Sequence, residues 1–372
     1  MSSVHRVLVT GAKGFIGKNL VLRLRELPGF EVLEFTRGDR PETLRALLAR
    51  ADAVVHLAGE NRPQDERDFA RVNTELTQSV CDAIRAAGRP ITLLLASSTQ
   101  ATLDNPYGTS KRAAEQAVER LAQQTGNPSF IYRLPGVFGK WCRPHYNSVV
   151  ATFCHNIAHD QPIQINDAAA RVRVVYIDDV VNAFIAALSD TTPGLHEAVV
   201  QPDYTMALGD LAKQIHAFKR CRTSLEVERV GTGLTRALYA TYVSYLPTAQ
   251  FCYDLQRYGD ERGVFVEMLK TPDAGQFSYF TAHPGIKRGS HYHHSKTEKF
   301  LVIKGQARFR FRHLMTDETF ELLTSGDVPK VVDTIPGWVH DITNVGNDEM
   351  IVMLWANENF DRDRPDTVAC KV

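Results

Sequence analysis

Four side chains toward the carboxy-terminal end of the chain have the chemistry of metal ligands. His291 and His293 are two positions apart, Glu298 follows five residues later, and His340 lies on a separate segment. In a strand, residues 291 and 293 project to the same face, and neighbouring strands can supply Glu298 and His340. Three imidazoles and a carboxylate suit a borderline divalent ion, with Zn²⁺ expected first and Ni²⁺, Fe²⁺ or Mn²⁺ as alternatives. A barrel without metal is the remaining interpretation.

A phenol and an ammonium group lie four residues apart at Tyr107 and Lys111, which puts both on one face of a helix. A positive charge beside a phenol stabilises the phenolate and lowers the pKa of the phenol, so Tyr107 is a candidate general acid for carbonyl reduction. Ser97 and Ser98 end the preceding strand, where a hydroxyl can bind the carbonyl oxygen of a substrate. Many helices contain such a pair, so it is convincing only together with a cofactor signature.

A glycine-rich turn after the first predicted strand supplies that signature. Glycines at these spacings allow a tight turn and bring backbone N–H groups, at the start of a helix, close to a pyrophosphate. The residues that we expect to contact a dinucleotide here are Gly11, Gly14, Phe15, Ile16 and Gly17. A plain strand-to-helix turn is the alternative for the glycines taken alone.

Two residues at the end of the second predicted strand indicate which dinucleotide binds. Thr36 and Arg37 stand where an acidic residue would hold the ribose of NAD(H). Because arginine pairs with a 2′-phosphate, NADPH is the expected cofactor, and a solvated surface arginine is the alternative. Ala58, after the third strand, lets the backbone approach the cofactor closely.

The segment from Lys140 to Ser148 combines cations, aromatic rings and an amide. Trp141, Tyr146 and Asn147 within it suit a diphosphate and a sugar, and we assign Arg133, upstream of it, to the substrate as well. A loop that packs its own aromatic side chains is the alternative.

The hydrophobic pattern changes along the chain, which predicts two domains. Residues 6–188 alternate short β-branched runs with segments of helical period, which predicts an α/β Rossmann-type doubly wound parallel sheet. From about Phe265 the chain has alternating strands separated by turns, which predicts an all-β barrel or sandwich. The change near Pro247–Asp260 divides a reductase-like domain, residues 1–250, from a β domain, residues 251–372.

Composition argues against two classes of partner. The 372 residues include 43 basic and 43 acidic side chains, so no global field draws the chain to nucleic acid or to an anionic membrane. No apolar run approaches the roughly 18 residues of a membrane span. The six cysteines include no CxxC pair and the start has no secretory segment, so a cytoplasmic protein with reduced thiols is expected.

The glycine turn, the serines at the strand end and the Tyr107-x3-Lys111 pair resemble the extended short-chain dehydrogenase/reductases. The resemblance implies that Ser98, with Thr99 as a substitute, completes a catalytic triad. It also implies that Lys111 binds the nicotinamide ribose and that Tyr107 contacts the cofactor. The usual substrates of this subclass are nucleotide sugars.

Residues 285–305 and 336–344 resemble the two motifs of cupins, so the β domain is expected to be a metal-binding cupin barrel. Arg288 and His291 also resemble the R-G-x-H motif of sugar-nucleotide 3,5-epimerases, metal-free cupins in which the histidine abstracts a proton next to a ketone. That resemblance implies a catalytic base at His291 and substrate binding at Arg288. A ligated His291 could not act so simply: either another residue is the base, or the metal is structural.

Across its full length the chain resembles the CapF family of capsular polysaccharide biosynthesis enzymes, for which a homodimer is expected. The resemblance implies that the cupin epimerises C3 of a UDP-2-acetamido-2,6-dideoxy-hexos-4-ulose and that the reductase then reduces C4 with NADPH. The implied product is UDP-N-acetyl-6-deoxy-L-talosamine, on the path to UDP-N-acetyl-L-fucosamine. The alternatives are an NADPH-dependent 4-ketoreductase with a structural cupin and a non-catalytic scaffold of a polysaccharide complex.

Overall fold

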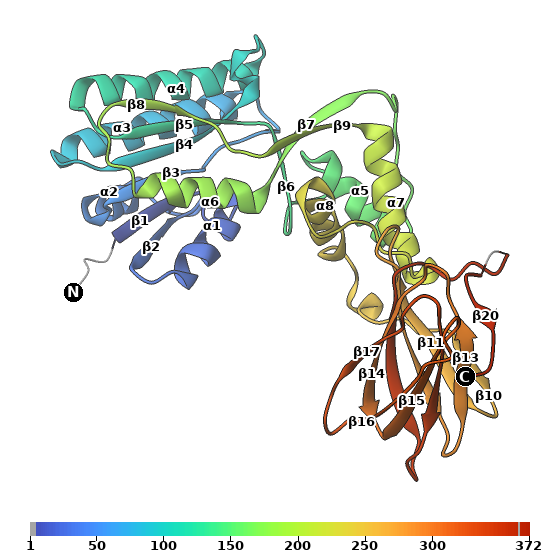
Figure 1. Cartoon of the computed structure of the whole chain (residues 1–372). Helices are drawn as coiled ribbons and strands as arrows, with labels where there is room; N and C mark the ends of the chain where they lie inside the picture. The colour runs from blue at the N-terminus through green and yellow to red at the C-terminus, as the bar shows by residue number, and fades with distance from the viewer. Residues whose placement is uncertain (1–4, 364) are drawn as a thin grey trace. The chain divides into compact units, whose positions relative to one another are not determined.

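The computed structural model describes residues 5–363 and 365–372, which pack as two units (Figure 1). The first unit contains the chain up to Ile215 and Ala237–Leu246, and the second contains His216–Arg236 and Pro247–Val372. Each unit has its own hydrophobic core.

Residues 216–236 pack with the second unit, although the sequence assigned them to the first domain. Backbone hydrogen bonds explain this placement. Val227 N–H donates to Lys270 O at 2.8 Å, and Lys270 N–H donates to Leu225 O at 2.7 Å. An ion pair between Arg229 and Asp273 adds to the contact. Such a long-range pairing has no signature in local periodicity.

The main sheet of the first unit is parallel, and its order β2-β1-β3-β4-β5-β8 confirms the predicted doubly wound topology. Its strands are β1 (His5–Thr10), β2 (Phe30–Phe35), β3 (Ala53–His56), β4 (Thr92–Ser98), β5 (Ser129–Leu134) and β8 (Leu195–Ala198). The chain passes from β1 to β2 on one side and returns to β3 on the other. Sheets of this kind bind ligands at the carboxyl ends of the strands at this switch point.

Helices cover both faces of this sheet (Figure 1). They are α1 (Phe15–Glu26), α2 (Pro41–Arg50), α3 (Leu76–Ala87), α4 (Pro106–Thr125) and α6 (Ile177–Leu188). Apolar residues of α2, α3 and α4, such as Leu48, Ile84 and Val118, fill one core with the strands, while α1 and α6 contact each other. The helical periods in the sequence therefore mark true core faces.

The structure adds elements that periodicity did not reveal. A small sheet joins β6 (Gly136–Phe138), β7 (Arg171–Tyr176) and β9 (Asp203–Ala207). Three further helices are α5 (Val149–Ala158), α7 (Leu208–Ser224) and α8 (Gly233–Val243), and three short helical segments are η1 (Phe69–Glu75), η2 (Thr99–Thr102) and η3 (Thr248–Gln250).

The second unit contains two antiparallel sheets, which confirms the predicted β-rich domain. One sheet has the order β10-β11-β12-β19-β14-β17 and the other has the order β16-β15-β18-β13-β20. The strands are β10 (Arg257–Asp260), β11 (Gly263–Lys270), β12 (Gln276–Ala282), β13 (Lys287–Tyr292), β14 (Glu298–Lys304), β15 (Gln306–His313), β16 (Thr319–Ser325), β17 (Val331–Asp333), β18 (Trp338–Asn344), β19 (Met350–Ala356) and β20 (Val368–Ala369). Alternate residues such as Phe280, Phe300 and Phe309 form the core. Closure of these sheets into a cupin barrel stays a prediction.

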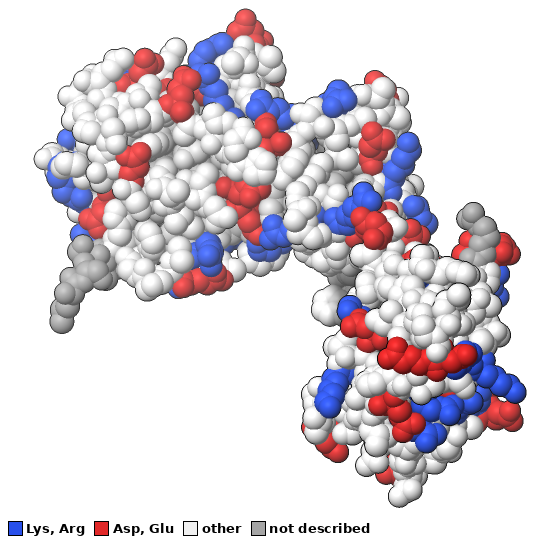
Figure 2. Space-filling model, viewed as in Figure 1, with Lys and Arg blue, Asp and Glu red and all other residues white. Residues whose placement is uncertain are grey.

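Charges of both signs lie on the face of the molecule seen in Figure 2. Lys and Arg side chains lie among Asp and Glu side chains on this face. Among the described residues, no helix combines the length and apolar character that crossing a membrane requires.

Candidate active sites

The turn between β1 and α1 requires glycine at two positions. Gly11 has φ +67°, and a Cβ there would lie 2.8 Å from Ala58 N. A Cβ at Gly17 would lie 2.3 Å from Gly11 O, so α1 packs directly on the turn. Gly14 is the N-cap of α1, and the first N–H groups of this helix have no partner within the helix. This is the geometry of an anion-binding helix terminus.

Two cavities with shared walls open at this turn. One has a volume of about 720 Å³, and its lining includes Gly11, Gly14, Phe15, Ile16, Gly17, Arg37, Ser98, Tyr107, Lys111, Tyr146 and Asn147. The other has a volume of about 910 Å³, and its lining includes Gly11, Gly14, Thr36, Arg37, Ala58 and Tyr146. The fold therefore gathers the predicted dinucleotide residues and the Ser-Tyr-Lys set in one region of the first unit.

The cap of α4 fixes where the tyrosine and the lysine lie. Asn105 accepts a hydrogen bond from Gly108 N–H at 2.7 Å and so starts the helix just before Tyr107. Ser98 ends β4, where its hydroxyl accepts from Gln100 N–H at 3.1 Å and lies close enough to Tyr107 to influence the pKa of the phenol. Lys111 follows one turn later and is buried. The three side chains thus meet although Ser98 comes from a strand and the others from a helix.

Burial dominates the pKa of Tyr107. It raises this pKa above its ordinary value, and the hydrogen bond from Ser98 opposes the rise only in part. The lowered pKa predicted from the sequence is therefore wrong. Lys111 Nζ donates to Ala96 O at 2.7 Å, and burial lowers the pKa of Lys111 to about 8. A phenol with a raised pKa stays protonated at neutral pH, as a proton donor must.

An ion pair holds Arg37 at the edge of both cavities. Its Nη2 lies 2.5 Å from Glu60 Oε2, while Glu60 Oε1 accepts a hydrogen bond from Tyr146 at 3.0 Å. Burial would raise the pKa of Glu60, but Arg37 and Tyr146 hold it below its ordinary value. Glu60 was not predicted from the sequence, where its only signal is its position directly after Gly59, the glycine that follows β3.

The structure separates the residues that the sequence assigned to the substrate. Tyr146 and Asn147 line the 720 Å³ cavity. Trp141, which is 49% exposed, lines a different hollow against α1. Arg133 binds the buried carboxylate of Glu115 through two nitrogens, with Nη2 2.8 Å from Oε2. Arg133 lines neither the 720 Å³ cavity nor the 910 Å³ cavity. Its guanidinium is bound to Glu115 instead.

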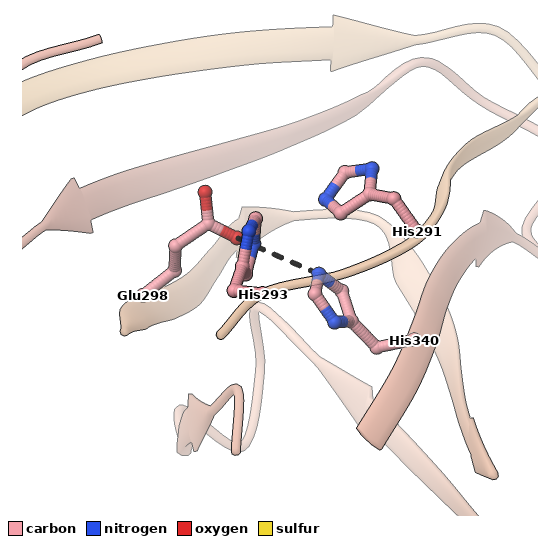
Figure 3. A group of neighbouring side chains, drawn as sticks. All are labelled: His291, His293, Glu298 and His340. Atoms are coloured by element: carbon pink, nitrogen blue, oxygen red, sulfur yellow. Dashed lines mark hydrogen bonds and ion pairs between the residues drawn. The ribbon is translucent and has the colours of Figure 1, made fainter. Parts of the chain in front are cut away.

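His291, His293, Glu298 and His340 converge in the second unit (Figure 3). His291 on β13 lies directly opposite His340 on β18 in the five-stranded sheet. Glu298 opens β14, which belongs to the six-stranded sheet. The expectation that Glu298 comes from a strand next to the histidines is therefore wrong, because the cluster joins two sheets.

The strand that carries His291 is irregular. A bulge shifts the register of β13 between Gly289 and His291, and Ser290 has φ +63°. β13 ends at Tyr292, so His293 lies just beyond it and not on the same strand as predicted. Bulges of this kind re-aim side chains near functional sites.

Burial and mutual contacts set the electrostatics of this cluster. Burial, with His340 nearby, lowers the pKa of His291 to about 4, so its imidazole is neutral at pH 7. Burial alone would raise the pKa of Glu298, but the hydrogen bond from His293 and the nearby imidazole of His340 keep it well below its ordinary value. Glu298 Oε2 lies 3.2 Å from His293 Nε2, and Oε1 lies 3.2 Å from Lys296 Nζ.

The same four residues fit a divalent cation. One ligand atom from each lies within 4.8 Å of all the others. Ligands bound to one ion at about 2.0 to 2.2 Å lie within about 4.4 Å of each other, so small side-chain adjustments suffice. Neither ring nitrogen of the buried His340 has a hydrogen-bond partner among the described residues. Its Nε2 makes only a long contact of 3.5 Å with Glu298 Oε2, and a buried imidazole so weakly paired is costly unless it binds something.

Arg288 lies beside this cluster. With His291, Glu298 and His340 it lines a cavity of about 130 Å³. Its Nε and Nη2 are buried without hydrogen-bond partners among the described residues, and its guanidinium lies over the ring of Phe280 at 5.2 Å. Buried guanidinium donors of this kind can bind an oxygen of a ligand.

Comparison with known proteins identifies both units. The NAD dependent epimerase/dehydratase family matches residues 7–201, and the polysaccharide biosynthesis C-terminal domain matches residues 258–368. A UDP-2-acetamido-2,6-beta-L-arabino-hexul-4-ose reductase of Pseudomonas aeruginosa is 55% identical over 99% of both chains. The capsular polysaccharide assembling protein CapF of Staphylococcus aureus is 41% identical, with a TM-score of 0.91 over 98% of this chain and 100% of that chain. The chain belongs to the CapF family.

Membership of the CapF family confirms the resemblance found in the motifs. A CapF crystal structure with the inhibitor 3-isopropenyl-tropolone is 37% identical, with a TM-score of 0.86 over 99% of this chain and 100% of that chain. A UDP-glucuronic acid 4-epimerase from Bacillus cereus in complex with NAD is 18% identical, with a TM-score of 0.55 over 64% of this chain and 98% of that chain, and shares the fold only. The matched family indicates a nicotinamide cofactor.

Proposed function

We propose that the chain is a bifunctional cytoplasmic enzyme that acts on a UDP-2-acetamido-2,6-dideoxy-hexos-4-ulose. The second unit epimerises C3, and the first unit reduces the C4 ketone with NADPH to give UDP-N-acetyl-6-deoxy-L-talosamine, on the path to UDP-N-acetyl-L-fucosamine. The substrate class follows from the names of the relatives, since a UDP-hexulose reductase matches the whole chain. The observation that carries the reductase half is the Ser98, Tyr107 and Lys111 set on the wall of the glycine-turn cavity.

The reduction needs a hydride at C4 and a proton at the C4 oxygen. NADPH supplies the hydride, and Tyr107 supplies the proton from a phenol whose pKa is raised by burial. Ser98, on the same cavity wall as Tyr107, holds the carbonyl oxygen beside that phenol. Lys111 binds the nicotinamide ribose. Tyr146 and Asn147, on the same cavity, contact the substrate.

NADPH is favoured over NADH because Arg37, at the rim of both cavities, can pair with a 2′-phosphate. The loop after β2 also contains an acidic side chain, Asp39, which accepts hydrogen bonds from Thr36. Its Oδ2 accepts from Thr36 N–H at 2.6 Å and from Thr36 Oγ1 at 3.0 Å. That oxygen is therefore already satisfied, which argues against a ribose-binding role for Asp39.

Epimerisation at C3 begins with loss of a proton that the neighbouring C4 ketone acidifies. His291, His293, Glu298 and His340 would hold a divalent metal, most simply Zn²⁺, which when bound would draw electron density from the carbonyl oxygen. The mutual proximity of the four ligand atoms supports a ligand role for His291. The alternative is that His291 binds no metal and acts as the base that removes the C3 proton. Its imidazole is neutral at pH 7, which suits both a metal ligand and a base. Arg288, with its unpaired donors, binds an oxygen of the sugar nucleotide.

We also propose a homodimer formed through the outer face of the six-stranded sheet. Tyr279, Met353, Leu301 and Val331 are successive cross-strand neighbours on β12, β19, β14 and β17. Residues adjacent to them along the strands fill the core, so this row faces outward. Met353 is 39% and Val331 is 59% exposed, which leaves an apolar row for a partner to cover. Met353→Glu should shift sedimentation from dimer to monomer, while a matched change at the 87% exposed Met315 should not.

Paired variants test the division of labour. Tyr107→Phe should stop NADPH oxidation yet retain exchange of the C3 hydrogen with solvent deuterium. His291→Ala should lose that exchange and leave NADPH binding intact, because the two units have separate cores. Metal analysis of His291→Ala then separates its roles, since loss of metal favours a ligand and retained metal favours a base. C3 exchange that survives in His291→Ala would contradict the assignment.

A further inference from the structure

The loop between two of the candidate metal ligands is held by one carboxylate. Residues 294–297 connect His293 to Glu298. Asp366 Oδ1 accepts from His294 N–H at 2.9 Å, and Oδ2 accepts from Ser295 N–H at 2.7 Å and from Lys296 N–H at 2.8 Å. The hydroxyl of Ser295 adds a bond at 3.1 Å. Three consecutive backbone N–H groups thus converge on a side chain about seventy positions away in the sequence.

The backbone of Asp366 binds the metal ligand itself. His293 Nδ1 donates to the carbonyl oxygen of Asp366. A carbonyl oxygen can only accept, so this bond places a proton on Nδ1 and leaves Nε2 as the ring nitrogen that can bind a metal. Nε2 is the nitrogen that lies 3.2 Å from Glu298 Oε2, inside the cluster. Bonds of this kind fix the tautomer and the ring orientation of metal-binding histidines.

The chain that carries Asp366 is fastened to the strand of another ligand. β20 pairs with β13, where Ala369 lies opposite His291. Just beyond, Cys370 N–H donates to Ser290 O at 2.9 Å, at the bulge that precedes His291. The segment from Asp366 to Cys370 therefore contacts the backbone on both sides of the histidine pair.

We propose that Asp366 is a positioning residue for the metal centre: it fixes the 294–296 loop and the Nδ1 of His293, and so holds His293 Nε2 and Glu298 at ligand distance. The inference rests on the proposed metal site. It also explains the position of Lys296, which is buried with its Nζ 3.2 Å from Glu298 Oε1. The loop geometry that Asp366 sets delivers this ammonium to the ligand oxygen that faces away from His293.

The test compares Asp366→Ala and Asp366→Asn with wild type in the full-length protein. Loss of a hydrogen-bonding partner behind a metal ligand typically lowers metal affinity about 10-fold to 100-fold. Zn²⁺ affinity, measured by competition with a chromophoric chelator, should fall by that amount in Asp366→Ala and by less in Asp366→Asn, which keeps one acceptor oxygen. The visible spectrum of the Co²⁺-loaded variants should change, because the loop between His293 and Glu298 is no longer held. Asp333→Ala is the matched control, since Asp333 is a half-exposed carboxylate of the same unit that pairs with Lys299.

Thermal unfolding separates positioning from a general structural role. For a positioning residue, the rise in Tm on adding Zn²⁺ shrinks in Asp366→Ala, while the Tm of the metal-free protein changes little. Equal losses in the metal-free and metal-loaded states, or an unchanged Zn²⁺ affinity and Co²⁺ spectrum, would overturn the inference. Wild-type protein that binds no metal would overturn the metal site together with it, whereas metal-binding wild type with an equally tight Asp366→Ala variant would overturn the inference alone.

Discussion

The burial of Lys111 should make the free energy of unfolding depend on pH, and this dependence can be measured. Its side chain is buried, and burial lowers its pKa from 10.5 to about 8. Between these two values the unfolded chain binds a proton that the native protein has lost. The free energy of unfolding of the wild type should therefore rise with pH across this window. Lys111→Met removes the titrating group but keeps an unbranched side chain, so its stability should lack this rise.

The expected size follows from the two pKa values. One pKa unit corresponds to about 1.4 kcal/mol, so the whole difference of about 2.5 units amounts to about 3 kcal/mol. Integrated from pH 7 to pH 10, the gain of the wild type over Lys111→Met is roughly 2 to 3 kcal/mol. The lost hydrogen bond to Ala96 O affects the variant at every pH and cancels in this comparison.

Urea unfolding at pH 7 and pH 10 measures this quantity. Trp141 is the only tryptophan of residues 1–250, so a background with Trp338→Phe and Trp355→Phe reports on the first unit. Lys18→Met, at an exposed lysine of α1, is the control and should show no such pH-dependent difference. A Lys111→Met protein whose stability relative to wild type stays constant over this range would refute the reasoning.

Three further outcomes are expected. Tyr107→Phe should lower the rate of reduction by about 10² to 10⁴ while the Kd for NADPH, measured by fluorescence titration, stays nearly constant; a rate near wild type would remove Tyr107 from the proton-donor role. Arg37→Ala should raise the KM for NADPH far more than that for NADH, because a charge-assisted contact to the 2′-phosphate is lost; an unchanged ratio of the two values would place the discrimination elsewhere. Removing metal with a chelator should abolish C3 exchange, leave NADPH binding intact and lower the Tm of the second unit, and calorimetry that shows no change on chelation would argue against a bound metal.

Local sequence signals predicted most strands of the main sheet in the first unit and several of its helices, because such signals are short-range. The strands and helices follow from periodicity, and the glycine turn follows from steric limits at Gly11 and Gly17. The proximity of Ser98 to Tyr107 could be inferred only through the family resemblance, since it depends on how α4 packs beside β4. The Lys111 ammonium donates to Ala96 O inside the protein. The spacing of Tyr107 and Lys111 in the sequence does not predict this buried contact.

The second unit shows where sequence reasoning fails. The motif identified all four members of the cluster, yet the bulge at Ser290 and the origin of Glu298 in the opposite sheet were not predicted. Asp366 has no motif at all, because its role depends on a contact between distant segments. In the first unit, Arg133 has the chemistry to bind a phosphate, but the buried Glu115 holds it instead.

The central claim is that two units of one chain catalyse two successive reactions on one sugar nucleotide. The most direct test is ¹H NMR of the UDP-4-keto sugar incubated with wild-type protein in D₂O, with and without NADPH. Without NADPH, the C3 proton signal should disappear as deuterium enters at that carbon, while the ketone persists. With NADPH, a C4-reduced product that carries deuterium at C3 should form. Reduction of the ketone without any C3 exchange would contradict the claim and leave the second unit without a catalytic role.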